Sequence, residues 1–226
     1  MELEKVKRSL LMNRDAYDAV RRVLRPGITE RQVFAAIEEA YEKNAGFRPK
    51  CIYDLVSGER AGAVSGEATD RILNEGDCLI ADLLPCFEGN WCDTTRTFFV
   101  GEPTPAWEKA YAAIVEALRA GEATLRAKAR AGDIFDAVDW SLKAQGYIGL
   151  VHHAGHAVGD SEQEEPDFVR GGEGRIESGM VVTLEPGIYV EGENGIRIEN
   201  NYLITDDGFT PLFDYPEEIH HFIAAF

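Results

Sequence analysis

Two acidic segments decide the fold of this chain: DLLPCFEGNWCD at residues 82–93 and EPGIYVEGENGIRIE at residues 185–199. Each begins and ends with a carboxylate and reads as two strands joined by a turn. Between them, HHAGHAVGD at residues 152–160 places a histidine in a Gly-His-x-x-Gly setting. Carboxylates rarely face a core unless a cation neutralises them, and this set suits two divalent ions that share a water. The candidate metal ligands are Asp82, Asp93, His156, Glu185 and Glu199.

The spacing of the first pair is compatible with shared ligation. If the hairpin turns around Phe87 and Glu88, Asp82 lies directly opposite Asp93. Directly opposed residues have Cβ atoms roughly 5 Å apart, so both carboxylates can reach one ion. The alternative is that these acids are ordinary charges on edge strands. The hairpin spacing, the histidine and the nearby glycines together favour the metal site.

The second pair is arranged in the same way. Glu185 and Glu199 lie opposite each other about a turn centred on Gly192, within the glycine-rich EGENG. Alternation along the last strand puts Arg197 on the same face as Glu199. Arg197 is therefore expected inside the site, where it either anchors a substrate carboxylate or forms a salt bridge to a metal-binding acid.

The chain also reads as two similar halves. Each half has two helices followed by a carboxylate hairpin, and Arg25 corresponds to Arg130 as Asp82 does to Glu185, at offsets of 105 and 103 residues. This pattern suggests an ancient duplication in which each half donates one pair. Because residue identity between the halves is weak, chance agreement of common helix caps is the alternative. The expected helices span about 3–23, 30–44, 105–128 and 134–145, and the β-rich stretches span 78–100 and 180–205.

Local signals mark the ends of these helices. Thr29 and Gln32 have the spacing of a capping box, and Thr104 before a proline suits a helix start. Asp133 is expected to cap the fourth helix and Gly146 to close it in a left-handed conformation.

Length and composition bound the remaining possibilities. The 226 residues are 45% hydrophobic and contain no linker or low-complexity run, so residues 1–226 are expected to form a single domain. A net charge of −17 argues against nucleic acid, whose phosphates need a basic surface. No secretory leader and no apolar run long enough to span a bilayer is evident, which predicts a cytoplasmic protein without a membrane partner.

The four cysteines lack the C-x-x-C spacing of a thiolate zinc site. They are expected to be reduced, buried and apolar in character, with Cys92 facing away from the neighbouring Asp93.

Four ordered motifs together resemble the pita-bread metallopeptidases, a family that includes methionine aminopeptidase, aminopeptidase P and prolidase. The resemblance covers essentially the whole chain. The motifs are D-x10-D-x-T-R-T at 82–97, H-x3-H-x2-G at 152–159, E-P-G at 185–187 and R-I-E at 197–199.

The resemblance implies an α+β pita-bread fold, with curved antiparallel sheets backed by four helices and related by a pseudo-twofold repeat. It implies that Asp82, Asp93 and Glu199 hold one ion, and that Asp93, His156, Glu185 and Glu199 hold the other. It also implies that Glu185 takes the water's proton and passes it to the leaving amine. The expected cofactors are two divalent ions, Mn²⁺, Co²⁺ or Zn²⁺. Relatives are often dimeric and longer by an N-terminal domain, so this chain is expected to be a homodimer of the catalytic unit alone.

The chain departs from the family in its accessory histidines. Members commonly carry one before the first ligand strand, where Ser65 stands here, and one seven residues after the ligand histidine, where Gln163 stands. Only the one four residues before the ligand, His152, is retained as a candidate catalytic residue. Gln163 and Arg197 are candidate substrate-binding residues. His153 is expected to have no consequence, and two histidines near the C-terminus are expected to lie on the surface, namely His220 and His221.

Three functions remain open at this point. The first is a metal-dependent exopeptidase that cleaves short peptides of the Xaa-Pro type, with the order of release from the N- or C-terminus undecided. The second is a C–N hydrolase like creatinase, although creatinase dispenses with the metal ligands that this chain retains. The third is a binding module of the same fold without turnover.

Overall fold

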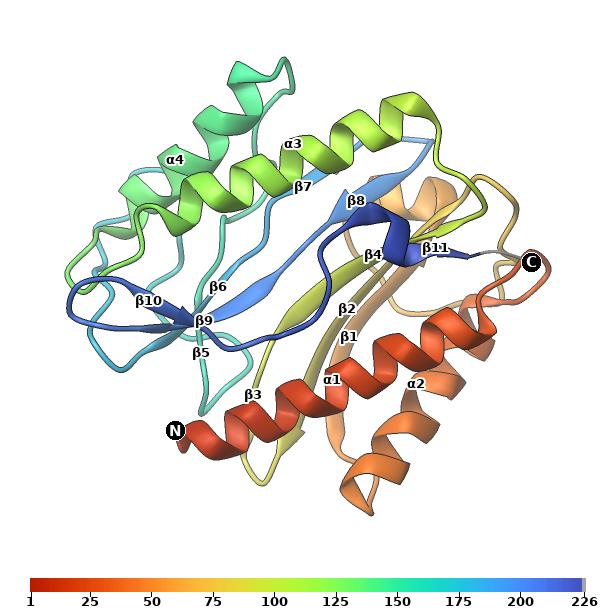
Figure 1. Cartoon of the computed structure of the whole chain (residues 1–226), viewed down its shortest axis with the longest axis horizontal. Coiled ribbons are helices and arrows are strands. Elements are labelled where there is room, and N and C mark those ends of the chain that lie inside the picture. The colour runs from red at the N-terminus through yellow and green to blue at the C-terminus, as the bar shows by residue number, and fades with distance from the viewer. Residues whose placement is uncertain (225–226) are drawn as a thin grey trace.

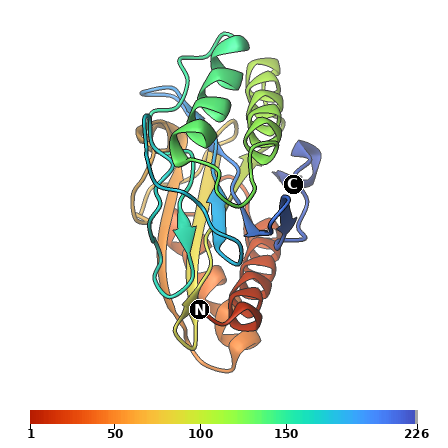
Figure 2. The same cartoon turned by 90° about the vertical axis from the view of Figure 1, so that its left-hand side faces the viewer.

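Helices cover one side of curved strands in this α+β structure, a computed structural model that describes residues 1–224. In Figure 1, α3 and α4 lie in the upper part of the view and α1 and α2 in the lower part, and Figure 2 shows the strands in a layer beside the helices. The four-helix expectation is confirmed. The helices are α1 (Leu3–Val23), α2 (Glu30–Ala45), α3 (Pro105–Glu122) and α4 (Ala131–Ala144), with short 3-10 helices η1 (Gly58–Ala63) and η2 (Ile219–Phe222).

The strands form three small sheets. In the first, β1, β2, β4 and β11 follow one another and β3 pairs with β2. The second has the order β10-β9-β6-β5, and the third is the pair β7-β8. The strands are β1 (Lys50–Ser57), β2 (Cys78–Phe87), β3 (Asn90–Trp91), β4 (Thr94–Val100), β5 (Ala157–Val158), β6 (Val181–Leu184), β7 (Gly187–Tyr189), β8 (Gly195–Arg197), β9 (Asn200–Ile204), β10 (Phe209–Pro211) and β11 (Ile223–Ala224).

The expected repeat is visible in matching backbone contacts. The N-cap residue of α2, Thr29, bridges to Ile72, and the N-cap residue of α4, Arg130, bridges to Arg175. Arg130 is therefore the counterpart of Thr29, and the predicted match of Arg130 with Arg25 is wrong. Equivalent positions of the two halves differ by one number of residues in the helices and by a slightly different number in the hairpins, so a single offset does not relate the halves.

Helix ends agree with the sequence in three of four cases. Thr29 and Gln32 form the capping box, Thr104 accepts a hydrogen bond from the backbone of its helix, and Gly146 adopts φ 91° just after α4. The cap assigned to Asp133 is wrong. Helix α4 begins at Ala131, inside which Asp133 pairs with the Arg130 guanidinium at 2.6 Å. Helix α3 also ends at Glu122, six residues before the expected end.

The first hairpin differs from the predicted register by two residues. Its turn is Glu88-Gly89, with φ values of 48° and 83°, the pair of positive φ angles that tight hairpin turns require. Asp82 therefore lies opposite Thr95, while Asp93 precedes Thr95 by two residues. The two aspartates are diagonal neighbours on one face, not directly opposed. The side chains of diagonal neighbours are still close enough to contact a common ion, so the shift in register preserves the predicted site.

The second hairpin has the predicted register. Gly187 pairs with Arg197 and Ile188 with Ile196, and Gly192 turns the chain with φ 76°. The same register continues into β6 and β9, where Leu184 pairs with Asn200. Glu185 and Glu199 flank this junction, as expected for opposed carboxylates.

The two halves meet where their hairpins touch. Thr95 of β4 bridges to Glu199, whose backbone N–H donates to the Thr95 carbonyl at 3.1 Å. Two residues on, the Thr97 hydroxyl and the Arg197 backbone exchange hydrogen bonds at 2.8 Å. This seam brings the aspartate hairpin and the glutamate hairpin onto a common surface.

Two further expectations concern the state of the cysteines and the absence of a membrane-spanning helix. All four cysteines are free thiols, as predicted, but only Cys78 and Cys92 are fully buried, while Cys51 and Cys86 are half-buried. Cys92 lies 3.6 Å from the Asn13 amide of α1, away from the site as expected. Within residues 1–224, every helix is too short or too polar to cross a membrane.

Candidate metal centre and substrate cavity

Four of the five predicted ligands line one cavity of about 350 Å³, between the aspartate hairpin and the segment before β5. Glu199 is 1% exposed and lies at the seam, where it bridges to Thr95. The structure therefore brings all five predicted ligands together. The other charged or polar residues that line the cavity include Asp54, Ser65, His152, His153, Glu162, Gln163 and Arg197.

His156 is oriented as a metal ligand. Its Nδ1 lies 2.9 Å from the Ala157 carbonyl, which fixes the proton on that nitrogen and leaves the Nε2 lone pair free. Nε2 lies 3.3 Å from Asp93 Oδ2 and 3.7 Å from Glu185 Oε1. One ligand atom each from Asp93, His156 and Glu199 all fall within 4.8 Å of one another, a spacing that fits a single ion.

Each of the four carboxylates keeps one buried oxygen without a hydrogen-bond partner among the described residues. Buried polar atoms are almost always paired, because an unpaired one costs free energy. Four orphaned oxygens in one place are therefore an observation in favour of bound cations, which accept oxygen ligands and supply positive charge. The atoms are Asp82 Oδ1, Asp93 Oδ1, Glu185 Oε1 and Glu199 Oε1.

Without bound cations, three of the four buried carboxylates have raised pKa values. Burial, followed by the charge of Glu199, raises the pKa of Asp93 well above its usual range. Burial and the charge of Glu185 do the same to the pKa of Glu199. Burial also raises the pKa of Asp82, against the charge of Arg197. A divalent ion must displace these protons to bind, so metal binding should release protons and should weaken in acid.

Glu185 differs from the other three acids. Burial works to raise its pKa, but the nearby imidazoles of His153 and His156 lower the pKa to about 2. Glu185 is thus the acid that remains ionised, because imidazoles surround it.

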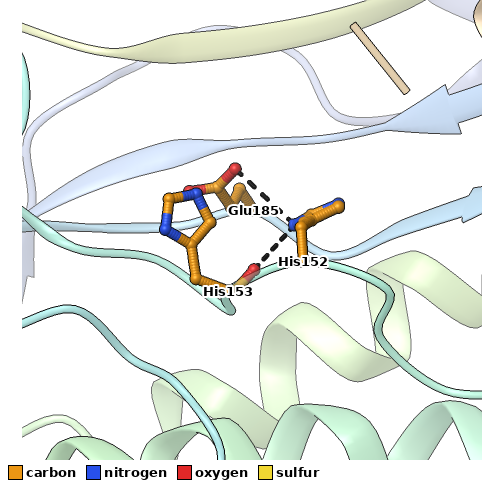
Figure 3. A group of neighbouring side chains, drawn as sticks. All are labelled: His152, His153 and Glu185. Carbon is orange, nitrogen blue, oxygen red and sulfur yellow. Dashed lines mark hydrogen bonds and ion pairs between the residues drawn. The ribbon is translucent and has the colours of Figure 1, made fainter. Parts of the chain in front are cut away.

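Figure 3 shows Glu185 between the rings of His152 and His153. His153 Nε2 lies 3.3 Å from Glu185 Oε1, so the prediction that His153 has no consequence is wrong. His152 lies nearby, but both of its ring nitrogens are hydrogen-bonded within the protein. Its Nε2 lies 2.8 Å from the Tyr189 hydroxyl and its Nδ1 2.7 Å from the His153 carbonyl. The only sequence signal for His153 was its place beside His152.

Arg197 forms the salt bridge that the sequence left open. Its Nη2 lies 2.6 Å from Asp82 Oδ2 and its Nη1 2.8 Å from the Tyr189 hydroxyl. The side chain is 3% exposed, with Nε 3.2 Å from the Thr95 hydroxyl. Arg197 therefore neutralises one oxygen of Asp82 and leaves the other for a metal ion.

Replacing Arg197 by methionine is expected to lower the free energy of unfolding by about 3–5 kcal/mol in chelator, because it leaves the Asp82 charge buried and unpaired. Urea unfolding checks this. Arg170→Met is the control: it breaks an ion pair to Asp139 from a side chain that is 62% exposed, and about 1 kcal/mol or less is expected. Equal losses in both variants would contradict the assigned role of Arg197.

The remaining predictions concern the two positions where relatives carry a histidine and the two histidines near the C-terminus. Ser65 and Gln163 both line the cavity and are exposed, and the Gln163 amide donates to Asp167 at 2.8 Å. His220 is exposed as predicted, whereas His221 is half-buried, with its ring centroid 5.9 Å from that of Tyr215.

A sequence profile described as metallopeptidase family M24 matches residues 4–206, which include all five predicted ligands. The chain belongs to metallopeptidase family M24. Among curated M24 relatives, the chain is 33% identical over 199 residues to a putative dipeptidase of Bacillus subtilis, covering 87% of this chain and 54% of that protein. It is 29% identical over 219 residues to the Xaa-Pro dipeptidase of Pyrococcus furiosus, covering 96% and 63%.

Solved structures of M24 enzymes have the same fold. The prolidase from Pyrococcus furiosus superposes with a TM-score of 0.90 at 29% identity, covering 95% of this chain and 64% of that one. The dipeptidase PepE from Mycobacterium ulcerans gives 0.92 at 30% identity, covering 99% and 60%. The predicted pita-bread fold is thereby confirmed. The chain spans 54–63% of the length of the two curated relatives named above.

Proposed function

We propose that this chain is the hydrolytic domain of a dinuclear metallopeptidase that cleaves short peptides of the Xaa-Pro type. The observation that carries the proposal is the set of four orphaned carboxylate oxygens beside the free Nε2 of His156. The similarity to an Xaa-Pro dipeptidase supports the substrate class.

The donor set fits two divalent ions. Asp82, Asp93 and Glu199 would hold one, and Asp93, His156, Glu185 and Glu199 the other. Hard oxygens with a single imidazole suit Mn²⁺, Co²⁺ or Zn²⁺. When bound, such ions polarise a peptide carbonyl and lower the pKa of a water towards neutrality.

The chain's own groups would then move protons and hold the ligands in place. Glu185 is the carboxylate placed to accept a proton, since it stays ionised, and to pass it to the leaving amine. His153 lies against the same carboxylate at 3.3 Å and orients it. Arg197 fixes Asp82, and Tyr189 fixes both Arg197 and His152.

A substrate panel tests this function against its alternatives. Metal-loaded protein is expected to hydrolyse Xaa-Pro peptides and to leave creatine-like amides intact. Hydrolysis of the amides alone would favour the creatinase-like alternative. Absence of turnover despite metal binding would favour the non-catalytic module.

The exposed Gln163 is expected to limit turnover, because a glutamine amide donates only a neutral hydrogen bond where relatives use histidine. Gln163→His should therefore raise kcat on Xaa-Pro dipeptides by several-fold, since charge-assisted hydrogen bonds are roughly twice as strong. Steady-state kinetics on matched metal loading checks this. Unchanged kcat would mean that the substitution is neutral.

Two further expectations concern the assembly and the compartment. The resemblance to dimeric relatives favours a homodimer, which light scattering would detect as about twice the chain mass of 25.0 kDa. The free cysteines suit a cytoplasm that keeps thiols reduced.

A further inference from the structure

Asp54 is a carboxylate that lines the cavity and lies outside the predicted ligand set. It lies on β1 directly opposite Asp82 of β2, and its side chain is 31% exposed. Its Oδ1 accepts the backbone N–H of Gly66 at 2.8 Å, which fixes the carboxylate in place. Its Oδ2 lies 3.9 Å from Arg197 Nη2, beyond hydrogen-bond distance. One oxygen of Asp54 is therefore anchored and the other is available to a ligand.

The charges around Asp54 favour a cationic ligand. Arg197 is the only arginine among the described lining residues, no lysine lines the cavity, and the Arg197 guanidinium is hydrogen-bonded to Asp82 and lies farther from Asp54. Two divalent ions would offset the charges of the four ligand carboxylates. The formal charges that remain at the cavity wall are then those of Asp54, Glu162 and Arg197, and the wall is acidic by one charge. This wall attracts an ammonium group and offers no free guanidinium or ammonium to a carboxylate.

We propose that Asp54 binds the free α-amino group of the substrate, so that this site releases the N-terminal residue and does not require a free C-terminus. The inference rests on the proposed peptidase function and adds to it the end of the peptide that is recognised. Asp54 would be a specificity-determining residue for peptides with an unblocked N-terminus.

The spacing of the strands fits this role. Directly opposed residues have Cβ atoms roughly 5 Å apart, which places Asp54 one strand away from a metal ligand. The amino nitrogen of a peptide is about 2.5 Å from its first carbonyl carbon, from standard bond lengths and angles. A charge-assisted hydrogen bond adds about 2.8 Å. An ammonium held by Asp54 therefore sets the first peptide carbonyl beside Asp82, where hydrolysis is proposed to occur.

A purely structural role makes a different prediction. If Asp54 only supported Arg197, its loss would affect every substrate equally. Recognition of the amine instead affects only substrates that carry it. Ala-Pro-Phe and propionyl-Pro-Phe separate the two roles, because the second peptide has the same shape at its first residue and lacks the amino group.

The experiment compares kcat/KM for these two peptides on metal-loaded wild type and on Asp54→Asn, whose amide oxygen still accepts the Gly66 N–H. Wild type is expected to prefer Ala-Pro-Phe by about tenfold to a hundredfold, the range for a hydrogen bond to a charged group. Asp54→Asn is expected to lose most of that preference through the amine-bearing peptide alone, at unchanged melting temperature. Glu162→Gln is the matched variant and is expected to keep most of the preference.

Several outcomes would overturn the inference. A wild type that does not discriminate, an Asp54→Asn that slows both peptides equally, or a preference lost in Glu162→Gln instead would each do so. C-terminal amidation of Ala-Pro should change kcat/KM by only a few-fold, and abolition of cleavage would overturn the claim about the C-terminus. If neither peptide is hydrolysed, the proposed function fails. Calorimetric binding of the same two peptides then decides the role of Asp54, because equal affinities would contradict it.

Discussion

Replacing Glu185 by glutamine is expected to lower kcat by about a hundredfold or more, in line with general acid–base contributions. The glutamine keeps an oxygen for the metal ion but cannot accept or deliver a proton. Neighbouring imidazoles keep Glu185 ionised against the effect of burial, so the side chain is a carboxylate, the form that can take a proton, at neutral pH. The measurement is steady-state kcat on an Xaa-Pro peptide, with the metal content of the same sample determined.

Glu193→Gln serves as the control for Glu185→Gln, because Glu193 lies in the exposed turn between β7 and β8. Its kcat should match wild type. A Glu185→Gln protein that holds both ions and retains near-normal kcat would remove Glu185 from the proton-transfer step and leave it as a ligand only.

Divalent ions are expected to raise the melting temperature by about 10–20 °C near pH 7.5. A ligand that binds only the folded state adds to the free energy of unfolding, and chain length sets how far that addition shifts the melting temperature. Asp82, Asp93 and Glu199 have raised pKa values in the folded, metal-free protein. Their contribution to stability is full below the ordinary carboxyl pKa and is lost as the pH rises through the raised values. Glu185 has the opposite sign, and its contribution is lost only as the pH falls towards 2.

Metal-free protein should therefore become less stable as the pH rises above about 4, and the metal-induced rise in melting temperature should grow over the same range. Thermal melts with chelator or with Mn²⁺ measure both. In Asp93→Asn, the metal-induced rise should disappear, while the metal-free variant should melt above metal-free wild type at pH 7.5, because one repelling charge is gone. A lower melting temperature for metal-free Asp93→Asn would contradict this electrostatic account.

The clustering of the five predicted ligands could be predicted because each carboxylate pair flanks its own hairpin, and local spacing fixes which side chains share a face. The register of the second hairpin followed from Gly192 in the same way. The first register was missed because the turn lies at Glu88-Gly89, where Gly89 supplies a positive φ one residue later than assumed. A two-residue shift preserves the face, which is why the site survived the error.

The contacts made by the surrounding residues were not predictable from local pattern. Arg197 pairs with Asp82, 115 positions away, and His153 meets Glu185 only after the segment before β5 folds over the second hairpin. Asp54 faces the site because β1 happens to pair with β2 in that register. Such pairings depend on tertiary structure, and no spacing within one segment encodes them.

The central claim is that five side chains hold two divalent ions in each chain. Elemental analysis after incubation with Mn²⁺ and gel filtration tests it most directly, with circular dichroism to verify that the fold persists. Two ions per chain in wild type, and a clear loss in Asp93→Asn, are the predicted result. A folded wild-type protein that retains no metal would contradict the account.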